Sequence, residues 1–289
     1  MANTIVLKRR ISSIKSTKQI TKAMELVSAS KMRRAQERAL KSRAYQTLAY
    51  DLLARLSNLN EVKIHPLFEK RKEKSKLYIL VTSNSSLAGA YNSNVIKILS
   101  HAVLADQEQN IKSSIIAIGN RGAQFVRRLK EVDLIAVYPA FGDNPTENDI
   151  RPILNTIIDK YRKKEVDNVE LIYTLYKSNL VQVASKLDIL PADIDEANDK
   201  KSYDFINFEP SVETVLDNVA LRLIEVQLWQ SLLESLASEH SMRMLAMKNA
   251  TDNASDIIDD LTLEFNTARQ ASITQELAEI TGGAEALKD

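Results

Sequence analysis

The chain has 289 residues, of which 44% are hydrophobic and 27% are charged, and this composition is typical of a folded protein rather than a disordered one. It contains no cysteine, which excludes disulfides, thiolate metal sites and thiol switches. No apolar run is long enough to span a bilayer, and the N-terminus lacks the hydrophobic core of a secretory signal. The net charge is only +1, but bases dominate residues 8–43 while residues 251–265 carry acids and no base.

The N-terminal region predicts one long helix. Residues 1–65 contain neither glycine nor proline, and the first break is His65-Pro66, so we expect a helix over residues 4–59. Its apolar side is strong toward the end and thin near the start, where isoleucine and alanine are mixed with serine, threonine and lysine. A buried leucine contributes about 1.5–3 kcal/mol and a small residue much less. The apolar side of this helix is therefore too weak near its start to hold that part in place without further contacts.

The middle of the chain alternates between short apolar runs and helix-like stretches. Runs rich in Ile, Val and Tyr predict strands at residues 76–82, 114–118, 132–137, 169–176 and 180–190. The stretches between them predict helices at residues 92–109, 121–130 and 147–162. Strands that alternate with helices indicate a parallel sheet with helical crossovers. The last strand should instead pair with its predecessor through a turn at Lys177-Ser178-Asn179, and residues 198–201 should form a polar loop.

The C-terminal region predicts a second long helix, over residues 211–281, between Pro210 and the Gly282-Gly283 pair. Two rows of residues, spaced alternately three and four apart, give the seam of a coiled coil. One row contains Val219, Val226, Leu233, His240, Met247, Ala254, Leu261 and Ala268. The other row contains Leu216, Leu223, Gln230, Ala237, Met244, Thr251, Ile258 and Phe265. At roughly 105 Å this helix cannot fold back on a small core, so we expect it to pair with the N-terminal helix in an antiparallel coil.

The two arms are unequal in length. If both leave the middle domain at one level, the C-terminal arm projects farther by roughly 20 Å. This overhang still has an apolar stripe, formed by Ile273, Leu277, Ile280, Ala284 and Leu287. No helix of this chain remains to cover the stripe, which predicts a partner site. Fraying of the helix end and self-association are the alternatives.

These patterns together predict the fold class and the domains. The expected fold class is α/β, with a long antiparallel coiled coil of N- and C-terminal helices plus a Rossmann-like α/β middle domain. The expected domains are an N-terminal coiled-coil helix at residues 1–65, an α/β middle domain at residues 66–210, and a C-terminal coiled-coil helix at residues 211–289.

The loop at residues 83–94 follows a strand and precedes a helix, where a phosphate can bind to backbone amides. It has one glycine and no Lys-Ser/Thr ending, so it is neither a P-loop nor a dinucleotide fingerprint. We interpret it as a strand-to-helix turn capped by Asn92 or Ser93, and residues 119–122 in the same way. The three histidines are far apart in the sequence, and His240 falls on the coil seam, where a hydrogen-bonded polar layer is expected. We expect no catalytic site, metal or cofactor.

The basic N-terminal arm raises the alternative of nucleic-acid binding. Serine and threonine, however, stand between its bases where aromatic residues that stack on bases would be expected. A solvated face beside an acidic C-terminal arm explains the charges equally well. Two other functions stay open at this point: a coiled-coil arm on an α/β nucleotide- or RNA-binding enzyme, and a self-assembling scaffold.

Two terminal segments resemble the γ-subunit family of bacterial F-type ATP synthases. They are residues 5–34, above all STKQITKAMELVSASKMR, and residues 238–287, which contain TARQASIT. The middle loop LAGAYNSN is similar to that family's as well. The resemblance covers essentially the whole chain. The chain departs from it at Asn84-Ser85-Ser86, where the family usually has an acidic residue, a basic residue and glycine.

The resemblance implies a rotating central shaft without an active site of its own. In this family the coil fills a hexamer of three α and three β subunits, and the foot rests with the ε subunit on the membrane c ring. Proton flow turns the ring and the shaft, and the coil drives the β subunits through their nucleotide-binding states. The resemblance implies no cofactor, no nucleic acid, no direct insertion into the membrane, and a peripheral place on the cytoplasmic face of the bacterial cell membrane.

The resemblance also implies roles for particular residues. Arg269 and Gln270, in TARQASIT, match positions that hydrogen-bond a β-subunit loop. Met24 and Arg243 match positions near an acidic segment of β. Lys22, Arg9 and Arg10 are expected to attract the β subunit by charge. The apolar collar of the hexamer is expected to enclose Ile273, Leu277, Ile280 and Leu287. The foot that meets ε and the c ring is expected to contain Phe208 and Glu209.

Overall fold

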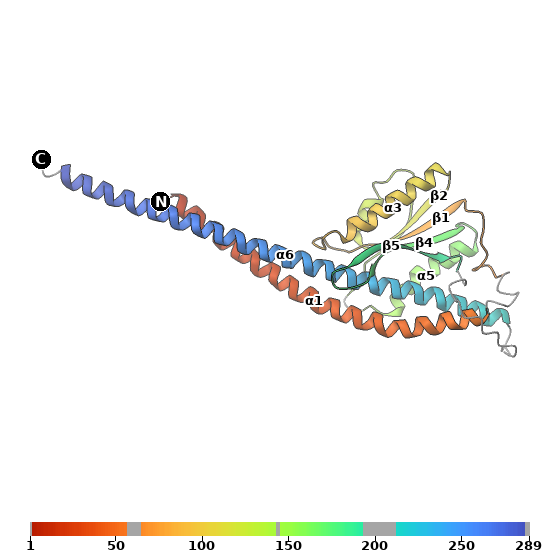
Figure 1. Cartoon of the computed structure of the whole chain (residues 1–289). Coiled ribbons are helices and arrows are strands. Elements are labelled where there is room, and N and C mark those ends of the chain that lie inside the picture. The colour runs from red at the N-terminus through yellow and green to blue at the C-terminus, as the bar shows by residue number, and fades with distance from the viewer. Residues whose placement is uncertain (1, 57–64, 143–144, 193–211, 287–289) are drawn as a thin grey trace. The chain divides into compact units, whose positions relative to one another are not determined.

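The computed structural model describes residues 2–56, 65–142, 145–192 and 212–286. Within these ranges two long helices, α1 (Ala2–Leu56) and α6 (Val212–Ala286), stand at the two ends of the chain. The strands and the shorter helices lie between them in sequence (Figure 1). The predicted α/β fold class, with long terminal helices and a five-stranded sheet, is confirmed.

The sheet has the strand order β3-β2-β1-β4-β5. β1 lies at its centre and pairs in parallel with both β2 and β4, while β3 pairs in parallel with β2. β5 is antiparallel to β4, as the turn at Lys177-Ser178-Asn179 predicts. The strands are β1 (Ser75–Val81), β2 (Lys112–Ile118), β3 (Asp133–Tyr138), β4 (Asn168–Tyr176) and β5 (Gln182–Leu190). All five predicted strands are present, with ends shifted by a few residues.

Each face of the sheet carries its own apolar core. On one face α3 (Tyr91–Glu108) and α4 (Asn120–Val126) cover a cluster that includes Tyr78, Leu80 and Ile115. On the other face α5 (Glu147–Arg162) and the first part of α6 pack over a larger cluster, and both helices lie below the sheet in the view of Figure 1. The alternation of buried strand residues between the two clusters follows the two-residue period of a pleated strand.

The helix predicted over residues 121–130 is shorter than expected, because α4 ends at Val126. Beyond it the N–H groups of Arg128 and Leu129 bond carbonyls three residues earlier, so the chain tightens into turns. Glu131 then adopts a φ of 72°, which stops any continuation of the helix.

α6 is longer than expected at its C-terminal end. The Gly282-Gly283 pair was predicted to close this helix, yet α6 continues through both glycines to Ala286. Neither glycine has the positive φ of a helix-ending cap. Each glycine costs a helix only about 1 kcal/mol relative to alanine, which is too little to stop a helix this long. The predicted end of the first helix, residue 59, lies outside the described residues, and α1 is described as far as Leu56.

By its internal packing the chain divides into two units, each considered by itself here. The coil unit comprises residues 1–28 and 244–289, and the α/β unit comprises residues 29–243. In the coil unit α1 and α6 lie side by side, and the Thr251 hydroxyl donates to the Thr21 hydroxyl at 2.8 Å. The buried residues of this seam are few and mostly small or flexible: Leu7, Ser28, Met247, Thr251, Ala254 and Ile258. The thin seam that the sequence predicted is confirmed.

In the α/β unit α6 has two buried faces. One face is the predicted coil seam, where Val226, Leu233 and Ala237 are buried beside α1. The other face packs on the sheet and contributes Leu216, Ala220, Leu223, Ile224, Leu228 and Leu232 to the larger core. Of these six residues, the predicted heptad rows contain Leu216 and Leu223, and the other four lie outside both rows. This part of α6 is therefore both a core helix of the α/β fold and one of the two helices of the coiled coil.

Candidate functional site

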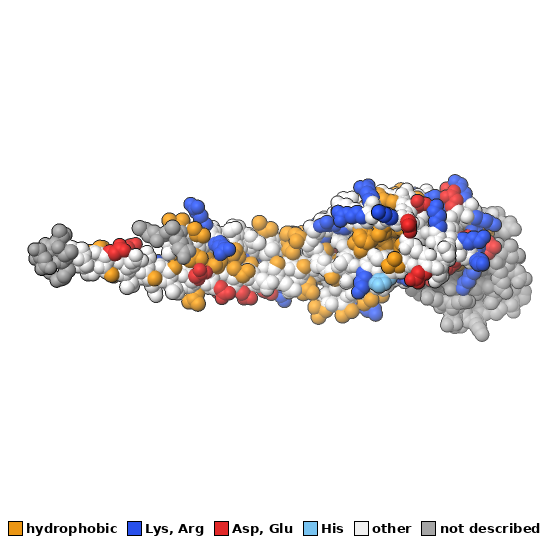
Figure 2. Space-filling view, turned by 90° about the horizontal axis from the view of Figure 1, so that it is seen from above, with side chains coloured by type: hydrophobic (Ala, Val, Ile, Leu, Met, Phe, Trp, Pro, Cys, Tyr) orange, Lys and Arg blue, Asp and Glu red, His pale blue; other side chains and the backbone are white. Residues whose placement is uncertain are grey.

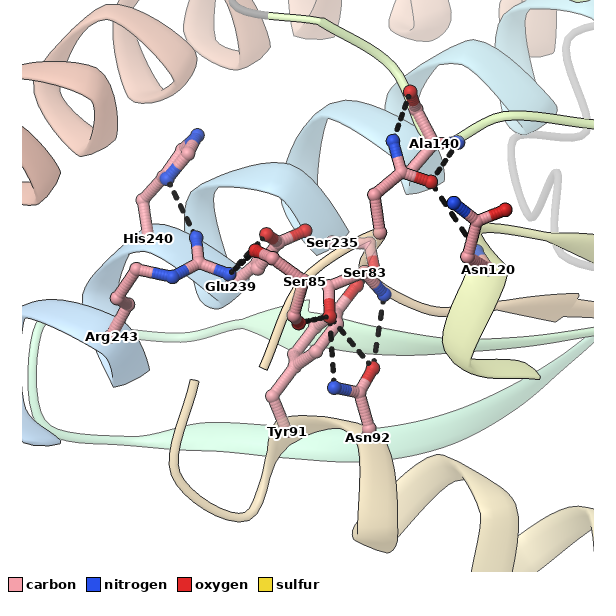
Figure 3. Close-up of polar contacts among 11 residues, drawn as sticks. Ser83, Ser85, Tyr91, Asn92, Asn120, Ala140, Ser235, Glu239, His240 and Arg243 are labelled. Carbon is pink, nitrogen blue, oxygen red and sulfur yellow. Dashed lines mark hydrogen bonds and ion pairs between the residues drawn. The ribbon is translucent and has the colours of Figure 1, made fainter. Parts of the chain in front are cut away.

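The carboxyl edge of the sheet is where doubly wound proteins bind nucleotides, in the crevice at which the strand order reverses. Here that reversal lies between β1 and β4. Tyr91, which follows β1 at the start of α3, shares a hydrogen bond of 2.8 Å with Ser235 of α6 (Figure 3). The Ser235 hydroxyl also accepts the backbone N–H of Thr174, near the end of β4, at 3.3 Å. α6 therefore occupies the crevice, which argues against a nucleotide-binding enzyme.

Serines continue this contact along α6. The Ser238 hydroxyl donates to the carbonyl oxygen of Thr174 at 3.2 Å. One turn farther on, the Ser241 hydroxyl donates to the carbonyl oxygen of Asn179 at 2.9 Å and accepts from Gln182 at 3.1 Å. These serines are almost wholly buried, as is Ser231. Small hydroxyl side chains allow α6 to approach the sheet closely. They also form hydrogen bonds with backbone groups of Thr174 and Asn179.

The loop after β1 is held by its own side chains. The Ser83 N–H donates to Asn92 Oδ1 at 2.9 Å, Asn92 Nδ2 donates to Ser83 Oγ at 2.8 Å, and Ser83 Oγ donates to the carbonyl of Ser85 at 2.6 Å. The N-cap of α3 is Ala90, with no side-chain cap bond. The prediction that Asn92 or Ser93 caps this helix is therefore wrong, because Asn92 bonds back to the strand end instead.

Asn84 joins three loops at the same edge. Its Oδ1 accepts the backbone N–H of Asn120 at 3.3 Å and that of Ala140 at 3.1 Å, and its Nδ2 donates to the Ala140 carbonyl at 3.2 Å. These contacts connect the ends of β1, β2 and β3 (Figure 3). Asn84 is therefore an internal brace of this edge.

We expect Asn84→Ala to lower the free energy of unfolding by about 1–2 kcal/mol, because two backbone N–H groups lose their acceptor. Urea denaturation of the full chain measures the change. Asn94→Ala is the matched control, since Asn94 is an exposed asparagine of the next helix; a surface change of this kind stays within about 0.5 kcal/mol. Equal losses in the two variants would show that Asn84 is not a brace.

Arg243 lies in the α/β unit rather than on an open surface. Its guanidinium pairs with Glu239 at 2.7 Å, donates to Ser85 Oγ at 3.3 Å and lies 3.4 Å from His240 Nδ1. Burial raises the pKa of the Glu239 carboxyl, and the charge of Arg243 opposes that shift. His240 is buried within this polar layer, as the seam position predicted. The structure therefore gives Arg243 an internal partner, and its expected contact with β stays a prediction.

The remaining predicted β-contact residues lie in the coil unit. Arg9, Arg10, Arg269 and Gln270 are exposed, and Met24 is half-buried. The Lys22 ammonium pairs with Glu25 at 3.0 Å on the same helix. The structure brings the N-terminal and C-terminal members of this set into one unit.

The predicted collar residues project from the end of α6. Ile273, Leu277 and Ile280 are 49%, 58% and 68% exposed. The seam residues Leu261, Phe265 and Ala268 are half-buried, and almost every described residue after Ala268 is exposed. Figure 2 shows hydrophobic side chains on the surface of the coil unit. Leu287, and the predicted foot residues Phe208 and Glu209 with the loop at 198–201, lie outside the described residues.

Sequence reasoning missed the residues that hold α6 on the sheet, chiefly Tyr91, Ser235 and Ser238. A signal was present, since apolar residues such as Ile224, Leu228 and Leu232 lie outside both heptad rows and required a second buried face. Serines spaced three and four residues apart continue that same face.

Among the residues that the structure describes, no three histidine, aspartate or glutamate side chains are placed to hold a metal ion. No described helix combines the length and apolarity needed to cross a membrane.

The chain was compared with known proteins. The family model described as ATP synthase matches residues 3–287. An ATP synthase gamma chain of Pelotomaculum thermopropionicum is 42% identical over 283 residues, covering 98% of each protein. That of Symbiobacterium thermophilum is 41% identical over 289 residues, covering 99% of each.

Solved structures with the same fold include chains of two mitochondrial ATP synthases. A chain of the OSCP/F1/c-ring structure of Euglena gracilis mitochondrial ATP synthase has a TM-score of 0.69 at 16% identity, covering 99% of this chain and 95% of that one. A chain of the central stalk/c-ring structure from Tetrahymena thermophila has a TM-score of 0.64 at 23% identity, covering 80% and 99%. The structures support the architecture, and the sequence relatives extend over the full length of the chain. This chain belongs to the gamma chains of ATP synthase.

Proposed function

We propose that this gamma chain turns as the central shaft of an F-type ATP synthase and couples proton flow through the membrane c ring to ATP synthesis at sites formed by α and β subunits. The observation that carries the proposal, beside the family, is the uncovered end of α6. Its apolar side chains at Ile273, Leu277 and Ile280 are between 49% and 68% exposed, which is costly unless other subunits enclose them. A hexamer of three α and three β subunits would supply that enclosure.

The shaft acts through contacts that differ among three otherwise equivalent β subunits. A protein can shift a conformational equilibrium only by binding the alternative states with different affinity. Arg269 and Gln270 are exposed on α6 and can donate hydrogen bonds to a loop of one β at a time. Each third of a turn of the shaft moves these contacts to the next β subunit, which then changes its affinity for nucleotide.

General charge attraction supplements these directional contacts. Arg9 and Arg10 are exposed near the start of α1 and would face an acidic segment of β. Met24 would pack nearby, and Lys22 would add attraction although it shares its charge with Glu25. Surface charges of this kind raise association rates more than they raise affinity.

The foot of the shaft would carry the load from the membrane. Phe208 and Glu209, outside the described residues, are proposed to meet the ε subunit and the c ring. The protein would thus be peripheral on the cytoplasmic face of the bacterial cell membrane, held there by its partners.

Reconstitution with the cognate α and β subunits tests this function. We expect the purified α and β subunits to co-purify with the chain and to gain robust ATPase activity when it is added. The gain arises because only a bound shaft makes the β subunits pass in order through their states. Activity that stays unchanged, with no co-purification, would contradict the proposal.

A further inference from the structure

Rotary coupling places a mechanical demand on one interface of the α/β unit, and the following inference rests on the proposed function. α6 is a single helix from Val212 to Ala286, so torque that enters the foot must pass into α6 before it reaches the exposed end. Inside the α/β unit α6 must therefore resist turning about its own axis and sliding along the sheet.

Apolar packing alone resists such slip poorly. The α6 residues in the larger core are mainly leucine, isoleucine and alanine, and hydrophobic contacts have no preferred direction. Hydrogen bonds do have direction and weaken steeply when their angle changes. A buried hydrogen bond is also costly to break, because water cannot reach the polar groups that lose their partner.

The hydrogen bonds of Ser235 have the geometry of a lock. Its hydroxyl lies 2.8 Å from the Tyr91 hydroxyl and 3.3 Å from the Thr174 nitrogen, so it joins α6 to two elements at once. Tyr91 follows β1 and Thr174 lies in β4, the two strands on either side of the filled crevice. Ser235 and Tyr91 are both almost wholly buried, and Figure 3 shows Tyr91 reaching toward Ser235 from the start of α3.

Two neighbours on α6 extend the same contact. Ser238 bonds the carbonyl of Thr174, and Ser241 bonds that of Asn179. The three serines follow one stripe of the helix at intervals of three residues. A turn of α6 about its axis would break all of these bonds together, whereas a purely apolar stripe could slip by steps.

We propose that Tyr91 and Ser235 are positioning residues for torque: they fix the rotational setting of α6 on the sheet, so that rotation of the foot reaches the exposed end of α6 without slip. They touch neither nucleotide nor a reacting atom. Their role is to keep α6 in the rotational setting seen here. Settings in which α6 has turned about its axis relative to the sheet then stay rare when the shaft works against a load.

The test uses the complete ATP synthase, reconstituted in vesicles, with Tyr91→Phe, Ser235→Ala and the double variant. Each hydrogen bond lost should raise the slipped population about five-fold, so the ratio of ATP-driven proton pumping to ATP hydrolysis should fall as the proton gradient builds. Ser235→Ala should lower the ratio more than Tyr91→Phe, because it leaves both the Tyr91 hydroxyl and the Thr174 N–H without their partner. With an uncoupler present, hydrolysis should match that of the unmodified enzyme.

Matched controls separate the lock from general stability. Tyr161→Phe removes another buried tyrosine hydroxyl, which donates to the Glu69 carbonyl, and Ser100→Ala removes a hydroxyl that bonds only within its own helix. Both should keep the normal pumping ratio. Ser235→Cys, of nearly the same size but a weaker donor, should give an intermediate ratio.

Three results would overturn the inference: a normal ratio under load in the double variant, an equal fall in the controls, or a loss of hydrolysis that persists with uncoupler. If the unmodified complex itself failed to pump, the proposed function would fail instead of this inference.

Discussion

Gly119→Ala is expected to destabilise the α/β unit by about 3 kcal/mol or more. Gly119 has φ 94° and ψ 145°, a region of backbone conformation that is essentially restricted to glycine. A Cβ added there would lie 2.2 Å from the carbonyl oxygen of Thr82, and backbone at the end of β1 cannot easily move away. To accept the methyl group, the backbone must therefore shift and lose hydrogen bonds that join the ends of β1, β2 and β3, such as those from Thr82 to Ile118 and from Gly119 to Tyr138.

The comparison variant is Gly142→Ala, where an added Cβ would meet nothing within 4 Å. Urea unfolding of both full-length variants measures the difference, and Gly142→Ala should stay within about 0.5 kcal/mol of the unmodified chain. If Gly119→Ala unfolded at the same urea concentration as Gly142→Ala, the strained junction described here would be wrong.

The double variant Arg269→Ala, Gln270→Ala is expected to lower coupled ATP synthesis about ten-fold or more, because a charge-assisted hydrogen bond is worth about 1.5–3 kcal/mol. Both side chains are exposed on α6, so their removal should leave the unfolding of the isolated chain unchanged. Steady-state synthesis by the reconstituted enzyme, set beside thermal unfolding of the chain, measures the two effects separately.

Asn266→Ala is the control for this pair, since Asn266 is an exposed amide one turn earlier on the same helix. It should leave synthesis within about two-fold of normal, because an isolated surface substitution contributes little. An equal loss of folding in the double variant would mean that Arg269 and Gln270 support the coil rather than contact β.

The middle of the fold could be predicted because its signals are local. Strands such as β1 and β4 are continuous apolar runs, which is what a parallel strand buried on both faces requires. The antiparallel β5 followed from a short polar turn. The end of α4 could not be predicted, since it depends on how residues 127–131 turn and not on a breaking residue.

The coil was predictable for a different reason. Two heptad rows identify a seam, and the burial of Leu233, Ala237 and Met247 confirms it. Most of the second face of α6 was missed, because residues such as Ile224 and Leu228 can be assigned to a buried face only when the sheet is known to lie beside them. Gly119 shows the same limit, since its strain comes from Thr82, far away in the sequence.

Function could be inferred from the sequence only through resemblance. Composition and spacing excluded catalytic motifs and pointed to a partner at the end of α6, but they could not identify that partner. The roles of two neighbouring loop residues could not be inferred from any sequence pattern: Asn84 braces three loops, and Ser85 accepts a hydrogen bond from Arg243. Such roles appear only when the distant residues are placed together.

Direct observation of rotation tests the central claim most closely. Because the chain has no cysteine, Gln107→Cys on the exposed side of α3 gives a single site for a fluorescent or bead label. With the αβ hexamer fixed to a surface and ATP supplied, we expect the label to turn in one direction in steps of one third of a revolution, matching the three catalytic αβ pairs. A label that stays still while ATP hydrolysis continues at its normal rate would contradict the account of this chain as a shaft.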